Sequence, residues 1–175
     1  MNEKPLLEFL QNNTIPYRLF EHQPVFTVDE IAVVTQVDGI PSSEELPGAH
    51  FKTLFLKDKN YRFFLVSVTE EKRVDLKALS SVLGCGRFSF GKPAELLELL
   101  KLTPGAVTPY GLLFDEHNKL TFVLDEDALN HSHVGFHPLR NDMTVVTTTP
   151  DFLACIEKMG YKPHVVSIPT KGVSQ

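Results

Sequence analysis

Three short segments of this 175-residue chain carry the side chains that could take part in chemistry. They hold a lysine, a glycine with a proline, and three histidines, and they are residues 50–53, 105–109 and 130–138. A lysine ammonium can bind a phosphate or a carboxylate. A histidine can serve as acid, base or metal ligand. All three segments are predicted to lie in loops or at strand ends, where functional residues concentrate.

Lys52 stands at the mouth of an apolar strand. Leu54, Phe55 and Leu56 follow it, and apolar residues on both faces of so short a run are typical of a strand buried in a sheet. A lysine at such a position can lie where the sheet core meets water, which suits it to hold a phosphate or a carboxylate. A lysine that simply faces solvent is the alternative for any lysine taken alone.

The histidines admit a metal site as an alternative. His131, His133 and His137 could supply three imidazoles, because alternate residues of a strand face the same way. This requires an extended segment, and no acidic partner stands at a fixed spacing. We therefore expect no metal, and for His137, close to Gly135, the roles of acid, base and pocket wall stay open.

No familiar catalytic motif accompanies these segments. The chain has no Ser-His-Asp order, no glycine-rich phosphate loop ending in Lys-Ser or Lys-Thr, and no Cys-x-x-Cys. Its two cysteines make neither a disulfide framework nor a metal motif, which fits a reducing compartment. Cys155 is predicted in the core of a helix. Cys85 is predicted in a loop and could be reactive, although no base stands beside it.

The charge is unevenly distributed along the chain. The net charge of −5 argues against nonspecific binding of nucleic acid, but residues 52–101 carry ten basic and six acidic side chains, a net of +4. The remaining residues carry seven basic and sixteen acidic side chains, a net of −9. The basic middle could mark a side that faces phosphates, or it could be the solvated surface of two helices.

The periodicity predicts a mixed sheet flanked by helices. Caps and apolar spacing indicate helices at residues 5–10, from 27 past 34, at 76–83, from 93 and from 150, with Thr149 capping the last one. Strands are expected at residues 17–20, 54–56, 61–68, 87–90, 112–114, 120–124, 134–137 and 144–147, with a loop at 37–47. The two strands around residues 115–118 are expected to form a hairpin.

Length and composition indicate one globular domain. At 19.7 kDa with 42% apolar residues, we expect a single domain at residues 1–169 and a frayed polar tail at 170–175. No run reaches the length of a membrane-spanning helix, and the N-terminus lacks the apolar core of a signal peptide. We therefore expect a cytoplasmic protein. The residues alone name no reaction.

Six collinear blocks resemble the YbaK/ProX prolyl-tRNA editing superfamily, the YbaK and aminoacyl-tRNA synthetase-associated domains. They cover nearly the whole chain and are residues 21–27, 48–52, 54–58, 86–91, 107–111 and 134–141. Within the superfamily the sequence is most similar to the free-standing Ala-tRNA(Pro) deacylases of the ProXp-ala or PrdX-like group. The resemblance implies an α/β (α+β) fold with a mixed, partly barrel-like sheet flanked by helices.

The resemblance also implies an activity, the hydrolysis of the ester that joins a wrong amino acid, alanine, to tRNA(Pro). Because alanine is smaller than proline, a synthetase pocket that admits proline cannot exclude alanine sterically, and a second, smaller site must remove it. The implied reaction needs no cofactor and is assisted by the 2′-hydroxyl of the substrate, which accounts for the missing protein base. The implied partners are the acceptor end of tRNA(Pro) and prolyl-tRNA synthetase. No membrane association is implied.

The family assigns roles to particular residues of this chain. Lys52 would hold the 3′-terminal nucleotide, and the catalytic set implied with it is Thr53, Gly105, Pro109 and His137. Of these, Gly105 and Pro109 would line the aminoacyl pocket with backbone groups, and His137 would form part of the wall that sets its size. The implied substrate-binding residues are Phe51, Val107, Thr108, Asn130, Gly135 and Phe136. Lys57 and Arg87 match positions that contact the tRNA acceptor stem.

One position departs from the family pattern. The family commonly has asparagine after the strand lysine, whereas this chain has Thr53, which keeps a hydroxyl but loses the reach and the second donor of an amide. Two alternatives follow: the same fold could remove cysteine, serine or threonine, or the domain could bind tRNA or a synthetase without hydrolysis.

Overall fold

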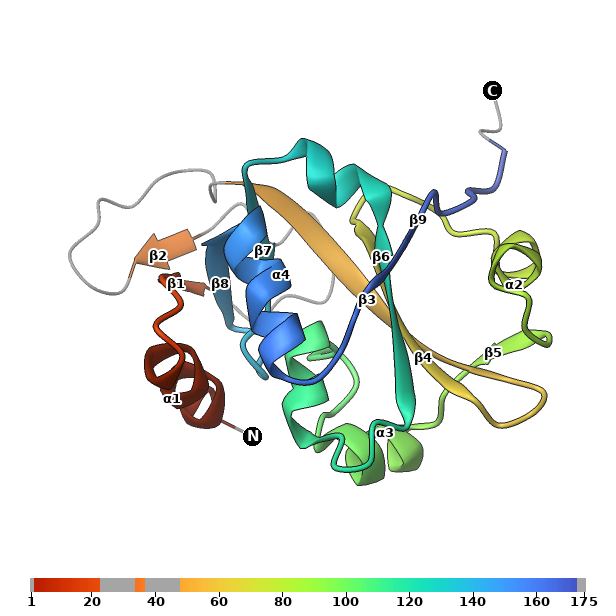
Figure 1. The fold of residues 1–175 in the computed structure, drawn as a ribbon, viewed down its shortest axis with the longest axis horizontal. Coiled ribbons are helices and arrows are strands. Elements are labelled where there is room, and N and C mark those ends of the chain that lie inside the picture. Colours follow the sequence, from red (N-terminus) through yellow and green to blue (C-terminus); the bar gives the residue numbers. More distant parts are fainter. Residues whose placement is uncertain (1, 23–33, 37–47, 173–175) are drawn as a thin grey trace.

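The computed structural model describes residues 2–22, 34–36 and 48–172. Within this part of the chain, nine strands form one mixed sheet with helices around it, as the sequence predicted (Figure 1). The strands are β1 (Arg18–His22), β2 (Val34–Gln36), β3 (Ala49–Asp58), β4 (Phe63–Thr69), β5 (Phe88–Phe90), β6 (Leu120–Asp125), β7 (His133–Phe136), β8 (Met143–Thr148) and β9 (His164–Val166). The helices are α1 (Lys4–Asn12), α2 (Leu76–Leu83), α3 (Pro93–Leu100), α4 (Thr149–Lys158) and the 3₁₀ helices η2 (Pro109–Phe114) and η3 (Glu126–Asn130).

The sheet is centred on β3, the longest strand. Its order is β2-β1-β8-β7-β3-β4-β6-β9, and β5 pairs with β3 beside this path. β3 runs antiparallel to β4 and β5 and parallel to β7. β6 is parallel to both β4 and β9. β3 therefore connects the half of the sheet that carries the histidines of residues 130–138 to the half that carries most of the basic segment, residues 52–101.

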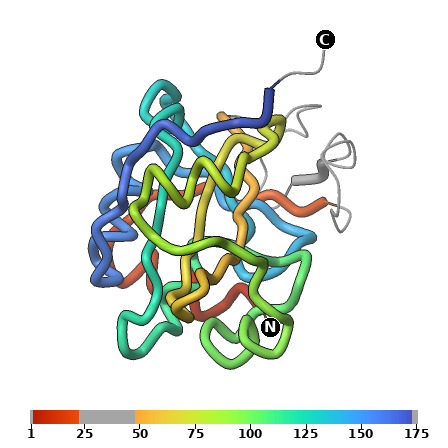
Figure 2. The backbone as a smooth tube through the Cα atoms, turned by 90° about the vertical axis from the view of Figure 1, so that its right-hand side faces the viewer, coloured from red at the N-terminus to blue at the C-terminus, as the bar shows by residue number. Residues whose placement is uncertain are grey.

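The two faces of β3 pack into different cores, because successive side chains of a strand point to opposite faces. Phe51 and Phe55 belong to the larger core, together with residues of α1, α3 and α4. Leu56 belongs to a smaller core under α2 and β5, and Leu54 packs against it. Figure 2 faces this second side and shows the yellow-green α2 lying in front of the strands β3 and β4.

The helices that flank the basic segment form where their caps predict. Asp75 accepts a hydrogen bond from the backbone N–H of Ala78, and Gly84, with φ of +64°, closes α2 in the left-handed conformation. Pro93 opens α3, in which Glu95 accepts a hydrogen bond from the backbone N–H of Lys92 at 2.8 Å.

The predicted hairpin around residues 115–118 is wrong. Residues 112–114, predicted as a strand, belong to η2 instead, because Thr108 caps its start and Pro109 and Leu112 are buried at the three-residue spacing of a 3₁₀ helix. β6 pairs in parallel with β4 and β9. The turn itself exists, since the Asp115 carboxylate accepts hydrogen bonds from the N–H groups of Lys119 and Leu120.

Other boundaries also differ from the prediction. β3 begins at Ala49, so that Lys52 lies inside a strand instead of at its start. Thr148, not Thr149, caps α4. The short strand β9 was missed. Val34, predicted within a helix, begins β2. The start of that helix at Thr27 and the loop at 37–47 lie outside the described residues.

The C-terminal segment is paired further than predicted. Thr170 forms a β-bridge with Val74, and the backbone N–H of Lys171 donates to the carbonyl of Arg73 at 2.8 Å. Figure 2 shows this dark-blue segment passing beside the chain that leads into α2. The frayed tail predicted from residue 170 is therefore wrong for Thr170 and Lys171, and the pairing holds Lys171 beside the basic segment.

Candidate functional site

Lys52 lies in β3 opposite Val68 of β4, with its side chain on the face that carries Leu54. Partial burial lowers the pKa of Lys52, while the carboxylates of Glu71 and Glu70 oppose this shift. The ammonium group thus loses part of its hydration and has no ion pair within 4 Å among the described residues. A bound anion would stabilise the charged form of Lys52 and so offset the hydration that the ammonium loses on burial.

Lys52 opens into a groove of about 1,000 Å³ between β3, β5, α2 and the C-terminal segment. Five cationic side chains line what we call the basic groove, and they are Lys52, Arg73, Lys77, Arg87 and Lys171. Asp75, the one carboxylate that lines it among the described residues, is engaged as the cap of α2. The groove therefore presents a strong excess of positive charge on a protein whose net charge is negative.

A second, much smaller cavity lies across β3. We call it the histidine pocket; its volume is about 10 Å³ and its lining residues are His50, Phe51, Glu70, Gly135, Phe136, His137 and Thr144. This is the room that a single water molecule needs. A methyl group is comparable in size, so the pocket admits only a very small side chain.

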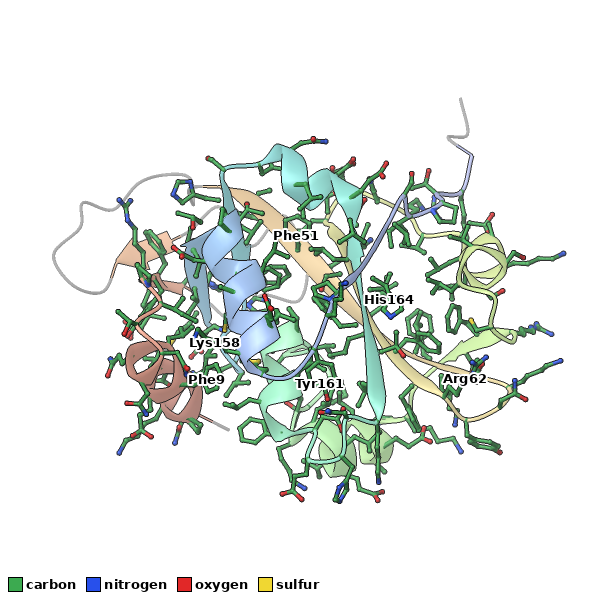
Figure 3. All side chains as sticks on the ribbon, in the orientation of Figure 1. Phe9, Phe51, Arg62, Lys158, Tyr161 and His164 are labelled. Atoms are coloured by element: carbon green, nitrogen blue, oxygen red, sulfur yellow. The ribbon has the colours of Figure 1, made fainter. Side chains whose placement is uncertain are left out.

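The walls of the histidine pocket are held by aromatic packing. Phe51 stacks on Phe136 with ring centroids 5.2 Å apart, and Phe136 stacks on Phe152 of α4 at 4.5 Å. Figure 3 labels Phe51 in the interior between β3 and α4. A Cβ atom added at Gly135 would stand 3.1 Å from Cγ2 of Thr144 and 3.8 Å from Cδ2 of His50. Glycine at 135 therefore keeps the pocket open.

His137 presents a hydrogen-bond acceptor. Burial lowers the pKa of His137, so that the imidazole is neutral at pH 7. Its Nδ1 lies 3.0 Å from the carbonyl oxygen of Met143, which can only accept a hydrogen bond. In the neutral ring the proton must then be on Nδ1, and Nε2 is the acceptor.

Glu70 lines the histidine pocket and interacts with Lys52 of the basic groove, and the sequence reasoning missed it. It lines the histidine pocket, its backbone N–H donates to the carbonyl of His50 at 3.2 Å, and its carboxylate interacts electrostatically with Lys52. Burial, reinforced by Glu71, raises the pKa of Glu70 to about 7. The pairing of Thr69 with Phe51 shows why Glu70 lies there, because a carboxylate directly after β4 must lie beside the start of β3.

The glycine–proline segment lies apart from both cavities. Gly105 is exposed with φ of +90°, while Thr108 and Pro109 are buried at the start of η2. None of residues 105–109 lines the basic groove or the histidine pocket, and neither does the exposed Asn130. The segment reaches the pocket indirectly, because Tyr110 packs edge-on against Phe136 at 6.1 Å.

The remaining predicted residues fall on different surfaces. Thr53 exchanges a hydrogen bond with Ser67 at 2.8 Å, so its hydroxyl is engaged within the sheet. Lys57 is on the opposite face of β3 from Lys52 and pairs with Glu95 at 3.1 Å, with its side chain 14% exposed. Arg87 lines the basic groove together with Lys52. Of the two residues predicted to bind tRNA, the structure thus brings Arg87 into the groove with Lys52 and holds Lys57 outside it.

The described part of the chain has neither a metal-binding cluster nor a membrane-spanning helix. It contains no group of three or more His, Cys, Asp and Glu side chains that could hold a metal ion, so His131, His133 and His137 do not form one. No helix in it is both long and apolar enough to cross a bilayer.

Comparison with known proteins gives a consistent family. The profile described as "Aminoacyl-tRNA editing domain" matches residues 22–155. "Prolyl-tRNA synthetase associated domain-containing protein 1" of Danio rerio is 36% identical over 94% of this chain and 86% of its own. "Prolyl-tRNA editing protein ProX" of Acetoanaerobium sticklandii is 35% identical over 83% of this chain and 85% of its own.

Solved structures share the fold. The crystal structure of a proposed trans-editing enzyme for prolyl-tRNA synthetase superposes with a TM-score of 0.71 and 20% identity, covering 97% of each chain. A second structure, a computationally designed epitope scaffold, superposes with a TM-score of 0.72 over 98% of this chain and 97% of its own, also at 20% identity. At this identity the likeness concerns the fold alone.

Proposed function

Because the chain belongs to the aminoacyl-tRNA editing domain family, we propose that it acts in trans as a deacylase of mischarged tRNA. The preferred substrate is Ala-tRNA(Pro). The observation that carries this proposal is that Lys52 lies in the basic groove and interacts with Glu70, which lines a pocket of methyl size. The groove suits the phosphates of a tRNA end, and the pocket suits the side chain of alanine.

The size of the histidine pocket supports the choice of amino acid. About 10 Å³ accommodates a methyl group and excludes the ring of proline. Apolar contacts alone discriminate between amino acids that differ by one methylene by only about 1–3 kcal/mol, so a synthetase selecting proline needs a second site that rejects its correct product. A rigid pocket walled by stacked aromatic rings supplies that rejection through overlap.

The reaction is hydrolysis of an ester. Water adds to the carbonyl carbon of the aminoacyl group, and the tetrahedral intermediate then loses the ribose oxygen, which takes up a proton. The products are free alanine and tRNA with an intact 3′ end. The 2′-hydroxyl of the substrate assists the attacking water, and the ammonium of Lys52 holds the terminal nucleotide and stabilises negative charge beside the ester.

The other proposed residues act around this centre. Gly135, Phe136 and His137 form the wall of the pocket, with Phe51 behind them. Gly105 and Pro109, with Val107 and Thr108, support that wall through Tyr110. Asn130, Lys57 and Arg87 are proposed as contacts to parts of the tRNA beyond the ester. Prolyl-tRNA synthetase is the proposed protein partner.

The test is a comparison of four substrates. Ala-tRNA(Pro) should be deacylated faster than Ala-tRNA(Ala), Pro-tRNA(Pro) and Cys-tRNA(Pro). Lys52→Ala should lower the rate on Ala-tRNA(Pro) by about 100- to 1,000-fold while the circular dichroism spectrum is unchanged. The control is Lys158→Ala, which removes an exposed lysine from α4 (labelled in Figure 3). Undiminished activity of the Lys52 variant would contradict the proposal.

Two other outcomes have a basis in Thr53. Its hydroxyl is occupied by Ser67, so it offers the substrate less than the asparagine of the family pattern. Faster deacylation of a tRNA charged with cysteine, serine or threonine would make that amino acid, instead of alanine, the one that the protein removes. Binding of tRNA without hydrolysis of any ester would make the domain a binding module.

A further inference from the structure

We propose that Phe90 is a stacking platform for an unpaired base of the tRNA 3′ end, lying in the basic groove beyond Lys52. This inference rests on the proposed function, because it takes the terminal nucleotide to be at Lys52. It adds an aromatic contact and a direction for the bound strand.

Phe90 is an aromatic ring that the protein core does not cover. In β5, Phe88 and Phe90 point to the same face, and Phe88 is 7% exposed because it packs edge-on against Phe64 at 5.0 Å. Phe90 lies at the end of the same row, past the edge of the smaller core, and is 60% exposed. It lines the basic groove. A large apolar ring left in water at a charged groove indicates a contact with a ligand.

The strand register sets the distance between Phe90 and Lys52. Phe90 pairs with Leu56 of β3, and Leu56 shares a face with Lys52 four residues earlier. At about 3.3 Å per residue these two positions are roughly 13 Å apart. A base stacked on Phe90 is therefore not the terminal adenosine at Lys52 but one that precedes it in the strand.

Cationic side chains lie on both sides of the groove that contains Lys52 and Phe90. Arg87 lies three residues before Phe90, and Lys77 extends from α2. On the other side the C-terminal pairing places Lys171 next to Arg73. Positive side chains that follow a backbone, combined with an exposed aromatic ring, are the combination by which proteins bind single-stranded nucleic acid. The partner that fits is an unpaired RNA segment, and the 3′ end of every tRNA is unpaired.

The test separates the ring from the charge. Phe90→Ala removes the ring, Phe90→Tyr and Phe90→Trp restore it, and Leu97→Ala removes a comparably exposed apolar side chain outside the groove. Affinity is measured with a short RNA ending in CCA that carries a fluorescent base analogue, and deacylation with Ala-tRNA(Pro). We expect Phe90→Ala to weaken RNA binding and raise KM by about 5- to 150-fold, with kcat nearly unchanged. The tyrosine and tryptophan variants and Leu97→Ala should behave like the native protein.

The outcomes distinguish this inference from the proposed function. Equal RNA affinity and KM in Phe90→Ala and the native protein would overturn the stacking role, and so would a loss that neither tyrosine nor tryptophan restores. If the native protein hydrolyses no mischarged tRNA but binds the RNA in a way that requires an aromatic residue at 90, stacking stands and the proposed function fails.

Discussion

Glu70 and Gly135 show how single residues set the properties of the candidate site. One brings a carboxylate that titrates near neutral pH to a position beside Lys52, and the other leaves room for a methyl group. Glu70 lies outside the six blocks that resemble the family, whereas Gly135 belongs to the block at residues 134–141. Their importance comes from neighbours that are distant in sequence: Thr69, the residue before Glu70, pairs with Phe51, and the side chain of Thr144 lies close to Gly135.

Replacing Glu70 with glutamine should stabilise the fold at high pH. Its ordinary pKa is 4.5 and its folded pKa is about 7, so the folded protein binds the proton more tightly than the unfolded chain. The ionised carboxylate therefore costs stability, a cost that is absent below about pH 4.5 and complete above about pH 7. Glu70→Gln should raise the free energy of unfolding at pH 8 by about 1–2 kcal/mol after allowance for solvent screening.

The measurement is urea denaturation at pH 5 and pH 8. At pH 5 the gain should be small, because most of Glu70 is already protonated in the folded state. Glu116→Gln, at an exposed position, is the control and should leave stability within about 0.5 kcal/mol at both pH values. An equal gain at both pH values would contradict the assignment of a raised pKa to Glu70.

Replacing Gly135 with alanine should close the histidine pocket. The added methyl would stand 3.1 Å from Cγ2 of Thr144, tight enough to need a small adjustment, and would occupy the space offered to the substrate. We expect deacylation of Ala-tRNA(Pro) to fall about 100-fold while binding of the RNA end in the basic groove is retained. A parallel loss of both, or a loss of neither, would show that this pocket does not hold the alanine side chain.

At the scale of elements, the turn between β3 and β4 fixes the far end of the basic groove. The side chain of Asp58 is fully buried and accepts hydrogen bonds from the N–H groups of Asn60, Arg62 and Gly86, as well as from the guanidinium of Arg62. Its contact with Gly86 attaches the segment that carries Arg87 to the hairpin. These hydrogen bonds outweigh burial and lower the pKa of Asp58.

Removing the Asp58 carboxylate should therefore be costly. Asp58→Ala removes the buried acceptor that three backbone N–H groups and the Arg62 guanidinium share, and we expect a loss of about 3–5 kcal/mol in the free energy of unfolding. The stability that Asp58 contributes is present above pH 4 and lost as pH falls through its depressed pKa. Urea denaturation at pH 7 measures the loss, and Glu116→Ala serves as the exposed control. A change below 1 kcal/mol would show that water replaces the lost acceptor.

The sequence predicted elements best where local chemistry determines them. The cap at Asp75, the proline at the start of α3 and the closing Gly84 each act within one turn, and these helices form where expected. Residues 112–114 were predicted as a strand but belong to η2, because their conformation depends on burial of Tyr110 and Leu112 against other elements. The strand β9 is only three residues long and exists because it pairs with β6.

The same limit applies to the candidate site. Lys52, His137 and Arg87 were predicted from the family pattern, but which of them share a cavity depends on the faces of β3 and on its neighbours in the sheet. Glu70 could have been found only with the pairing of β3 and β4 in hand. The composition of the site thus depends on the register in which β3 pairs with its neighbouring strands. The sequence specifies that register through core packing and not through a local motif.

At the scale of the whole molecule, the basic groove counters the negative charge of the rest of the protein. The net charge is −5, yet five cations converge on one cavity, and the pairing of Lys171 with Arg73 brings the C-terminal segment into it. A negative body repels nucleic acid except where the groove faces it. Binding should therefore be oriented and sensitive to salt.

The salt dependence of tRNA binding distinguishes Lys57 from Arg87, the two residues proposed to contact the acceptor stem. Each cation that neutralises a phosphate adds about 0.7–0.9 to the slope of log affinity against log salt. Arg87 lines the groove, so Arg87→Ala should reduce the slope by about that amount. Lys57 is paired with Glu95 at 3.1 Å, so Lys57→Ala removes a cation that is already partly neutralised and should change the slope less.

Binding is measured with uncharged tRNA(Pro) between 50 and 200 mM salt, with Lys158→Ala as the control. A larger slope change for Lys57 than for Arg87 would place the acceptor stem on the opposite face of β3.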